Sequence, residues 1–156
     1  MLPKCGEKKL MEENKIVAII KSRFEEIGNP AQISLLRGDG FFEAKMFDDG
    51  IYVDNLGTQP FLPWTVFTET FSLLKKEGGK AKKGNPMGPR LGEKALPFNS
   101  IEGHIAYTVY GKKEGDSVFR RTTPIVNILI WAGICKKKIG DLELLDCWGS
   151  NPQIVR

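Results

Sequence analysis

The chain has 156 residues, of which 41% are hydrophobic and 27% charged, with a net charge of +4. This composition excludes an intrinsically disordered chain, and the length suits one domain with a sizeable core. The longest apolar run, residues 124–134, is shorter than the ~20 residues of a membrane span, and no signal peptide is evident, so we expect a cytoplasmic protein without a membrane partner.

The first half of the chain predicts a helix followed by antiparallel strands. Residues 1–10 are expected to form a flexible tail, and residues 11–156 a single α+β domain. A helix is predicted from Glu12 to Ile27, because apolar side chains recur along one face. The Asp-Asp-Gly sequence at residues 48–50 indicates a hairpin turn. Strands are predicted over residues 32–36, 41–47 and 51–56.

The second half predicts three more helices and a terminal hairpin. Residues 80–99 are rich in glycine and proline and are expected to form a mobile, irregular loop. Pro124 lies inside the last predicted helix, which therefore either kinks there or begins there with Thr123 as its N-cap. The helices are predicted over residues 64–77, 100–110 and 117–133, and the hairpin strands over residues 134–138 and 142–145.

The order of these last elements is that of a helix–turn–helix followed by a wing. Two helices are separated by the turn at residues 111–115, and the sequence AGICKKKIGDLELL, residues 132–145, leaves the second helix and enters the hairpin. This segment resembles the winged helix–turn–helix superfamily. The resemblance implies that residues 62–146 are winged-helix-like, that residues 117–133 form a recognition helix, and that the partner is DNA.

Basic side chains gather in this half of the chain. Residues 1–74 hold 8 Lys and Arg against 11 Asp and Glu, a net charge of −3, whereas residues 75–156 hold 15 against 8, a net charge of +7. This asymmetry predicts an anionic partner, with a solvated basic surface as the alternative. The residues predicted to contact phosphate are Lys80, Lys82, Lys83 and Arg90 in the loop, and Lys136, Lys137 and Lys138 on the wing.

The last helix supplies the residues predicted to face DNA: Arg120, Arg121, Thr123 and Asn127. Arginine can pair with guanine and asparagine with adenine through two hydrogen bonds. The alternative for the arginines is binding to carboxylates of the acidic half. The alternative for the wing lysines is protection of an edge strand from unwanted pairing. Ile128 and Ile130 leave open a homodimer contact.

Features of catalysis are few. His104 is the only histidine and is expected to have a structural role, and no P-loop is present. Cys5, Cys135 and Cys147 have no metal-ligand spacing and are expected to be reduced thiols. We therefore predict no metal, no cofactor and no catalytic residue.

The favoured function is non-catalytic nucleic-acid binding, with duplex DNA preferred, in a regulator or a restriction or defence system. Two alternatives remain open. The first is a protein–protein adaptor that uses Trp64, Trp131 and Trp148. The second is a small metal-dependent nuclease that uses Asp39, Glu43 and Lys45.

Overall fold

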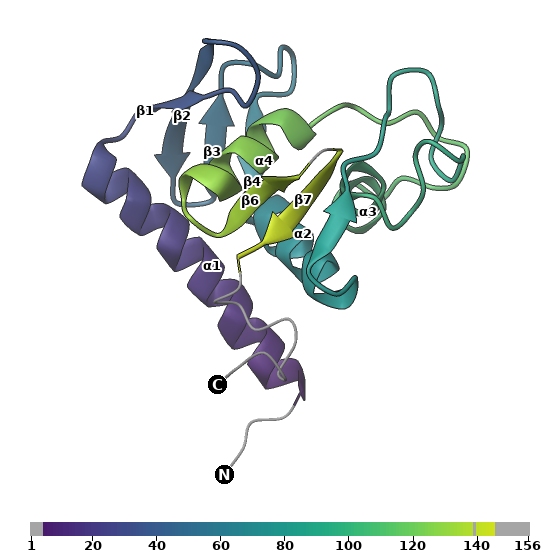
Figure 1. The fold of residues 1–156 in the computed structure, drawn as a ribbon, viewed down its shortest axis with the longest axis horizontal. Coiled ribbons are helices and arrows are strands. Elements are labelled where there is room, and N and C mark those ends of the chain that lie inside the picture. The colour runs from purple at the N-terminus through teal and green to yellow at the C-terminus, as the bar shows by residue number, and fades with distance from the viewer. Residues whose placement is uncertain (1–4, 139, 146–156) are drawn as a thin grey trace.

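The computed structural model describes residues 5–138 and 140–145, and the side chains from residue 12 onward. Within these residues the predicted α+β class is confirmed: helices pack with two antiparallel sheets (Figure 1). The first half contains α1 (Cys5–Ile27), β1 (Ala31–Ser34), β2 (Phe41–Phe47), β3 (Gly50–Val53) and β4 (Phe61–Pro63). The second half contains α2 (Trp64–Lys76), β5 (Lys80–Lys82), α3 (Ile101–Thr108), α4 (Thr122–Trp131), β6 (Cys135–Lys138) and β7 (Asp141–Leu144).

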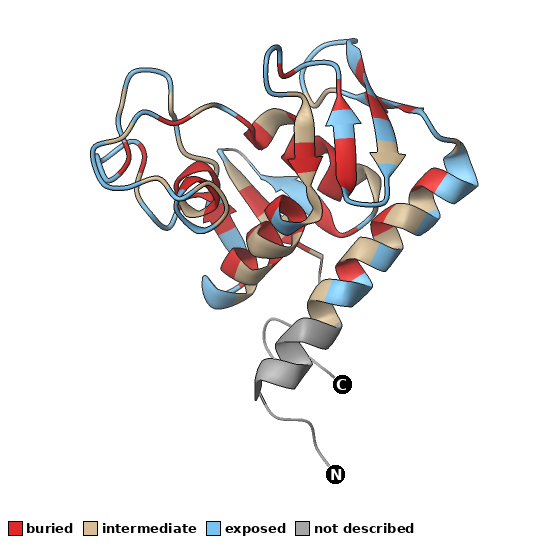
Figure 2. Cartoon of the chain, turned by 180° about the vertical axis from the view of Figure 1, so that it is seen from behind, coloured by how far each residue is buried: buried red, intermediate tan, exposed pale blue. Residues whose placement is uncertain are grey.

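Strands β1 to β4 form a four-stranded antiparallel meander, here called sheet A. The predicted hairpin at residues 48–50 joins β2 to β3, with Phe47 opposite Gly50. Buried and exposed residues alternate along β1 and most of β2, as expected for a sheet with one packed face (Figure 2). The packed face belongs to the main core, whereas Phe41, Phe47 and Tyr52 are exposed.

Helix α1 packs along α2 and reaches α4. The ring of Phe24 on α1 meets that of Trp131 edge-on at a centroid distance of 4.8 Å. The helix begins at Cys5 rather than at Glu12, so the predicted tail, residues 1–10, is too long. Residues 7–12 are Glu, Lys, Leu and Met, all strong helix formers, which accounts for the longer helix.

The second half runs α2–β5–α3–α4–β6–β7, and its three strands form sheet B in the order β5–β7–β6. The predicted hairpin β6–β7 is confirmed, with Lys138 opposite Asp141. The prediction that residues 80–99 are irregular throughout is wrong at their start, because Lys80 to Lys82 form β5 and pair with β7.

The rest of this segment has no regular strand or helix but is packed. Leu91 and Leu96 are buried with Ala106 and Val118 in a second, small core. Backbone hydrogen bonds join Leu91 to Asp116 and Gly115. Residues 83–99 are therefore irregular, as predicted, and their leucines are packed into the domain.

Helix α4 begins at Thr122, not at residue 117 as predicted, and residues 117–121 are irregular. Pro124 is its third residue. The first four N–H groups of a helix have no acceptor within it, so the missing N–H of Pro124 breaks no helical hydrogen bond. The helix therefore needs neither a kink nor a start at Pro124 itself.

Helix propensity favours alanine over glycine at position 103 of α3, but the packing there predicts that alanine destabilises the protein. Alanine normally stabilises a helix interior by about 1 kcal/mol over glycine, but a Cβ at this position would collide with the carbonyl oxygen of Pro97. That oxygen is held by the Ser100 hydroxyl, which donates to it at 2.6 Å. We expect Gly103→Ala to lower the free energy of unfolding by about 1–3 kcal/mol, the usual effect of overpacking, as measured by urea denaturation. A stabilised variant would show that α3 and Pro97 are less closely packed.

Candidate functional site

A concave pocket of about 530 Å³ forms where four separate segments meet. These segments are residues 35–37 between β1 and β2, residues 83–86 after β5, the residues at the start of α4, and the β6–β7 hairpin. The Nζ of Lys137 on β6 lies 3.5 Å from the carbonyl oxygen of Leu36 and so links the hairpin to sheet A. The pocket therefore joins the two halves of the chain.

Five cationic side chains line this pocket: Arg37, Lys83, Arg120, Lys137 and Lys138. No Asp or Glu is among its described lining residues. Within the described part of the chain, only Lys138 of these five forms an ion pair, with Glu143 at 3.9 Å. We call this site the basic pocket.

The pKa of Lys83 reflects these surroundings. Burial lowers it from its ordinary value of 10.5, and the nearby charges of Arg37, Lys137 and Arg120 lower it further. Asp141 acts in the opposite direction but has a smaller effect. Like charges that repel one another in a partly buried site are stabilised when an anion binds among them. The basic pocket is therefore suited to an anion.

The backbone N–H groups at the start of α4 already have an acceptor in the side chain of Glu102. The carboxylate of Glu102 on α3 is buried and accepts hydrogen bonds from the backbone N–H groups of Arg121 and Thr122, both at 2.9 Å. It also accepts a hydrogen bond from the Thr122 hydroxyl, at 2.9 Å. The helix terminus is thus occupied by a carboxylate of the chain itself, and any anion in the pocket must be held mainly by the five cations.

The structure contradicts the prediction that Arg121 faces DNA. Only 5% of this residue is exposed. Its guanidinium lies 3.7 Å from the ring centroid of Tyr110 and 4.9 Å from that of Phe119, and it donates hydrogen bonds to the Phe119 carbonyl and to Gln59. Arg121 is therefore packed against two aromatic rings of the segment that joins α3 to α4.

Asn127 lines the basic pocket, but it is buried and not on an exposed helix face as predicted. It is 4% exposed, and its Nδ2 donates to the Thr123 carbonyl oxygen at 2.6 Å, while its Oδ1 has no partner among the described residues. Helix α4 packs on β1 of sheet A, on β6 of sheet B and on α2, and most of its residues are buried (Figure 1). Arg120 is exposed and Thr123 half-buried, and both line the basic pocket.

The other predicted phosphate contacts divide into two groups. Lys83, Lys137 and Lys138 line the basic pocket. Lys136 lies outside it, 3.8 Å from Glu143, and Lys80, Lys82 and Arg90 are exposed residues that also lie outside it. Arg90 donates to the Gly115 carbonyl oxygen at 3.3 Å.

Arg37 lines the basic pocket, although it was not among the residues predicted from the sequence. It lies in the Arg-Gly-Asp turn before β2, where a surface role in a turn is the simplest interpretation. The packing of sheet A against α4 brings this turn beside residues more than 80 positions later, such as Arg120. No local pattern signals such a contact.

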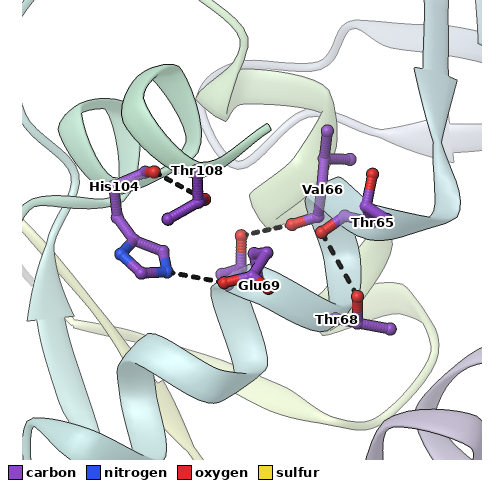
Figure 3. A network of polar contacts seen from close by, with 7 residues as sticks. Thr65, Val66, Thr68, Glu69, His104 and Thr108 are labelled. Carbon is purple, nitrogen blue, oxygen red and sulfur yellow. Dashed lines mark hydrogen bonds and ion pairs between the residues drawn. The ribbon is translucent and has the colours of Figure 1, made fainter. Parts of the chain in front are cut away.

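His104 has the structural setting that was expected. Figure 3 shows its ring reaching from α3 towards α2, where its Nε2 lies 2.9 Å from Oε1 of Glu69. Thr108 donates to the His104 carbonyl oxygen at 2.7 Å on the same helix. The histidine thus joins α3 to α2, and it does not line the basic pocket.

The residues of the two alternative functions lie in several places, and of the nuclease residues Glu43 and Lys45, but not Asp39, line a common pocket on sheet A. Trp131 packs inside the chain against Phe24, Trp64 donates to the Asp48 carbonyl oxygen at 2.9 Å, and Trp148 lies outside the described residues. Glu43 and Lys45 are exposed on β2. Among the described residues no three His, Cys, Asp or Glu side chains are grouped as a metal site requires.

Comparison with known proteins adds no relative. No family model matches the sequence, and no curated protein or solved structure shows a significant match to it. Among the helices of the described residues, none has the length and apolar character needed to cross a membrane. A proposal for function therefore rests on the geometry of the basic pocket.

Proposed function

We propose that this protein binds nucleic acid without catalysing a reaction, and that it holds backbone phosphates at the basic pocket. The observation that carries this proposal is the convergence of five cations, from four chain segments, on a concave site without a described acidic lining residue. Such charge supplies most of the affinity of proteins for nucleic acid. Duplex DNA remains the favoured form, and a cytoplasmic regulator or a restriction or defence component the favoured setting.

The order of elements in the second half supports a winged-helix-like module. The elements follow in the order α2–β5–α3–α4–β6–β7, the three strands lie in the spatial order β5–β7–β6, and the β6–β7 hairpin occupies the place of the wing. One feature differs from the recognition mode that the resemblance implies. Because α4 is mostly buried among β1, β6 and α2, contact through the wing and the basic pocket is favoured over insertion of α4 into a groove.

Salt titration of two matched triple variants tests this proposal. The first replaces three lysines of the pocket, as Lys83→Gln, Lys137→Gln and Lys138→Gln. The control replaces three exposed lysines outside it, as Lys76→Gln, Lys94→Gln and Lys113→Gln, with the same change in net charge. Binding to duplex DNA, single-stranded DNA and RNA is measured by fluorescence anisotropy at several salt concentrations.

We expect the pocket variant to bind duplex DNA more weakly, with a log–log salt slope shallower by about 0.9 for each phosphate that is no longer neutralised by a lysine. The control variant should keep the parental slope, because its lysines lie outside the site. If both variants behave alike, the basic pocket is not the binding site. Failure of all three nucleic acids to bind at low salt would refute the proposal.

One observation favours the adaptor as a second candidate. The outer face of sheet A carries the exposed rings of Phe47 and Tyr52, in edge-on contact at 5.1 Å, and the half-buried ring of Phe61 lies tilted against Tyr52 at 5.0 Å. Exposed aromatic clusters are frequent in protein interfaces. A protein partner bound there would give a complex whose affinity changes little with salt and is weakened by Tyr52→Ala.

A further inference from the structure

We propose that the basic pocket takes the terminal phosphate of a nucleic-acid strand, a phosphomonoester, in preference to the internal phosphodiesters of the backbone. This inference rests on the proposed function and specifies the ligand of the same site. Three features of the pocket support it: its size, its unmatched charge and its mixed lining.

The size of the pocket fits one nucleotide better than a length of duplex. About 530 Å³ lies within the usual range for small-ligand sites, about 300–1,000 Å³. The four segments that form it all line the site, and the turn at residues 35–37 adjoins the β6–β7 hairpin, where the Nζ of Lys137 lies 3.5 Å from the Leu36 carbonyl oxygen. The end of a strand can enter such a site, whereas an internal phosphate must bring the chain on both sides with it.

The charge of the pocket favours a ligand with more than one negative charge. Arg37, Lys83, Arg120 and Lys137 have no ion-pair partner among the described residues. An internal diester carries one negative charge, whereas a phosphomonoester carries about 1.5 to 2 at neutral pH and offers three acceptor oxygens. The additional negative charge of the phosphomonoester is attracted by the same cations, so the monoester should bind more tightly than the diester.

The lining has an apolar part beside the charged one. Leu35, Leu36, Val126 and Pro86 contribute to the walls, and Thr123 and Asn85 add polar groups. A terminal nucleotide presents a charged phosphate joined to an uncharged sugar and base, so both parts of such a ligand find matching surface. A free inorganic phosphate would leave the apolar walls unused.

The test compares one oligonucleotide in three forms, with a 5′-phosphate, with a 3′-phosphate, and with hydroxyl groups at both ends. Each form is measured as a single strand and as a blunt duplex by competition in fluorescence anisotropy. We expect at least one phosphorylated end to bind about tenfold more tightly than the hydroxyl form, the effect of one charge-assisted hydrogen bond. The preference should shrink when the pH falls below about 6, because the phosphomonoester then loses its second charge.

Neighbouring lysines provide a matched pair of variants. Lys83→Gln removes a cation of the pocket, whereas Lys82→Gln removes an exposed cation on β5 that does not line it. The preference for a phosphorylated end should fall towards unity in Lys83→Gln and persist in Lys82→Gln. Arg37→Gln, at an exposed turn, should repeat the loss without removing a partly buried side chain.

The outcomes separate this inference from the function on which it rests. Equal affinity for phosphorylated and hydroxyl ends, with salt-dependent binding retained, overturns the inference and leaves nucleic-acid binding in place. An end preference that survives in both Lys83→Gln and Arg37→Gln overturns it as well, because the phosphate is then held elsewhere. Absence of binding to every form overturns both.

Discussion

Replacing Glu102 by alanine is expected to lower the free energy of unfolding by about 3–5 kcal/mol, the range for removing one partner of a buried charged network. Glu102 is 1% exposed, and its carboxylate is the acceptor for the first N–H groups of α4 and for the Thr122 hydroxyl. Without it these donors stay buried without an acceptor, which is unfavourable for each of them. Chemical denaturation monitored by circular dichroism measures the change.

Two further variants define the cause of this effect. Glu25→Ala removes an exposed glutamate on α1 and should change the unfolding free energy by no more than about 0.5 kcal/mol. Glu102→Gln keeps the volume and one acceptor oxygen and should fall between the two. If Glu102→Ala resembled Glu25→Ala, the start of α4 would be held by other contacts.

The pH dependence of stability tests the same carboxyl group. Burial raises the pKa of Glu102 above its ordinary value of 4.5, and the hydrogen bonds from Thr122 and Arg121 oppose that shift only in part. The folded state therefore holds this proton more tightly than the unfolded state. The free energy of unfolding should therefore fall as the pH rises from 4.5 to the folded-state pKa. The Glu102→Gln variant has no carboxyl group at this position and should not show this fall.

The parts of the fold that the sequence predicted are those set by local patterns. Apolar residues four and three positions apart placed α1 and α2, and Asp-Asp-Gly placed the β2–β3 hairpin. Ser100 is the N-cap of α3, and its hydroxyl accepts from the Gly103 N–H at 3.1 Å. Such signals lie within a few residues of the element that they define.

The errors arise where a partner is distant in the sequence. Residues 117–121 continue the helical pattern, yet α4 starts at Thr122, where Glu102 of another helix caps it. Strand β5 has three residues and is stabilised by pairing with β7, with Ala81 opposite Leu142. Neither partner can be identified from the periodicity of the segment itself.

The candidate site also depends on contacts between residues that are distant in the sequence. The sequence predicted basic residues in the second half, and several of those named, among them Lys83 and Arg120, line the basic pocket. It placed Arg121 and Asn127 on an exposed face because helical spacing does not reveal that Tyr110 and Phe119 pack on Arg121, or that β1, β6 and α2 pack around α4. Arg37 enters the site through the same packing. The position of sheet A is thus what turns a basic surface into a pocket.

Replacing Leu129 by alanine tests this packing of α4 directly. Leu129 is fully buried in the main core, and α4 contacts α2, β1 and β6. We expect Leu129→Ala to lower the free energy of unfolding by about 2–5 kcal/mol, the range for a buried leucine. The measurement is urea denaturation at constant pH.

Ile27→Ala supplies the matched control. It removes the same number of carbon atoms from a side chain that is 52% exposed at the end of α1, so its effect should be within about 0.5 kcal/mol. A near-neutral result for Leu129→Ala would mean that sheet A and sheet B do not enclose α4. Asn127 could then be exposed on the helix. Insertion of α4 into a groove of DNA would in that case be favoured again.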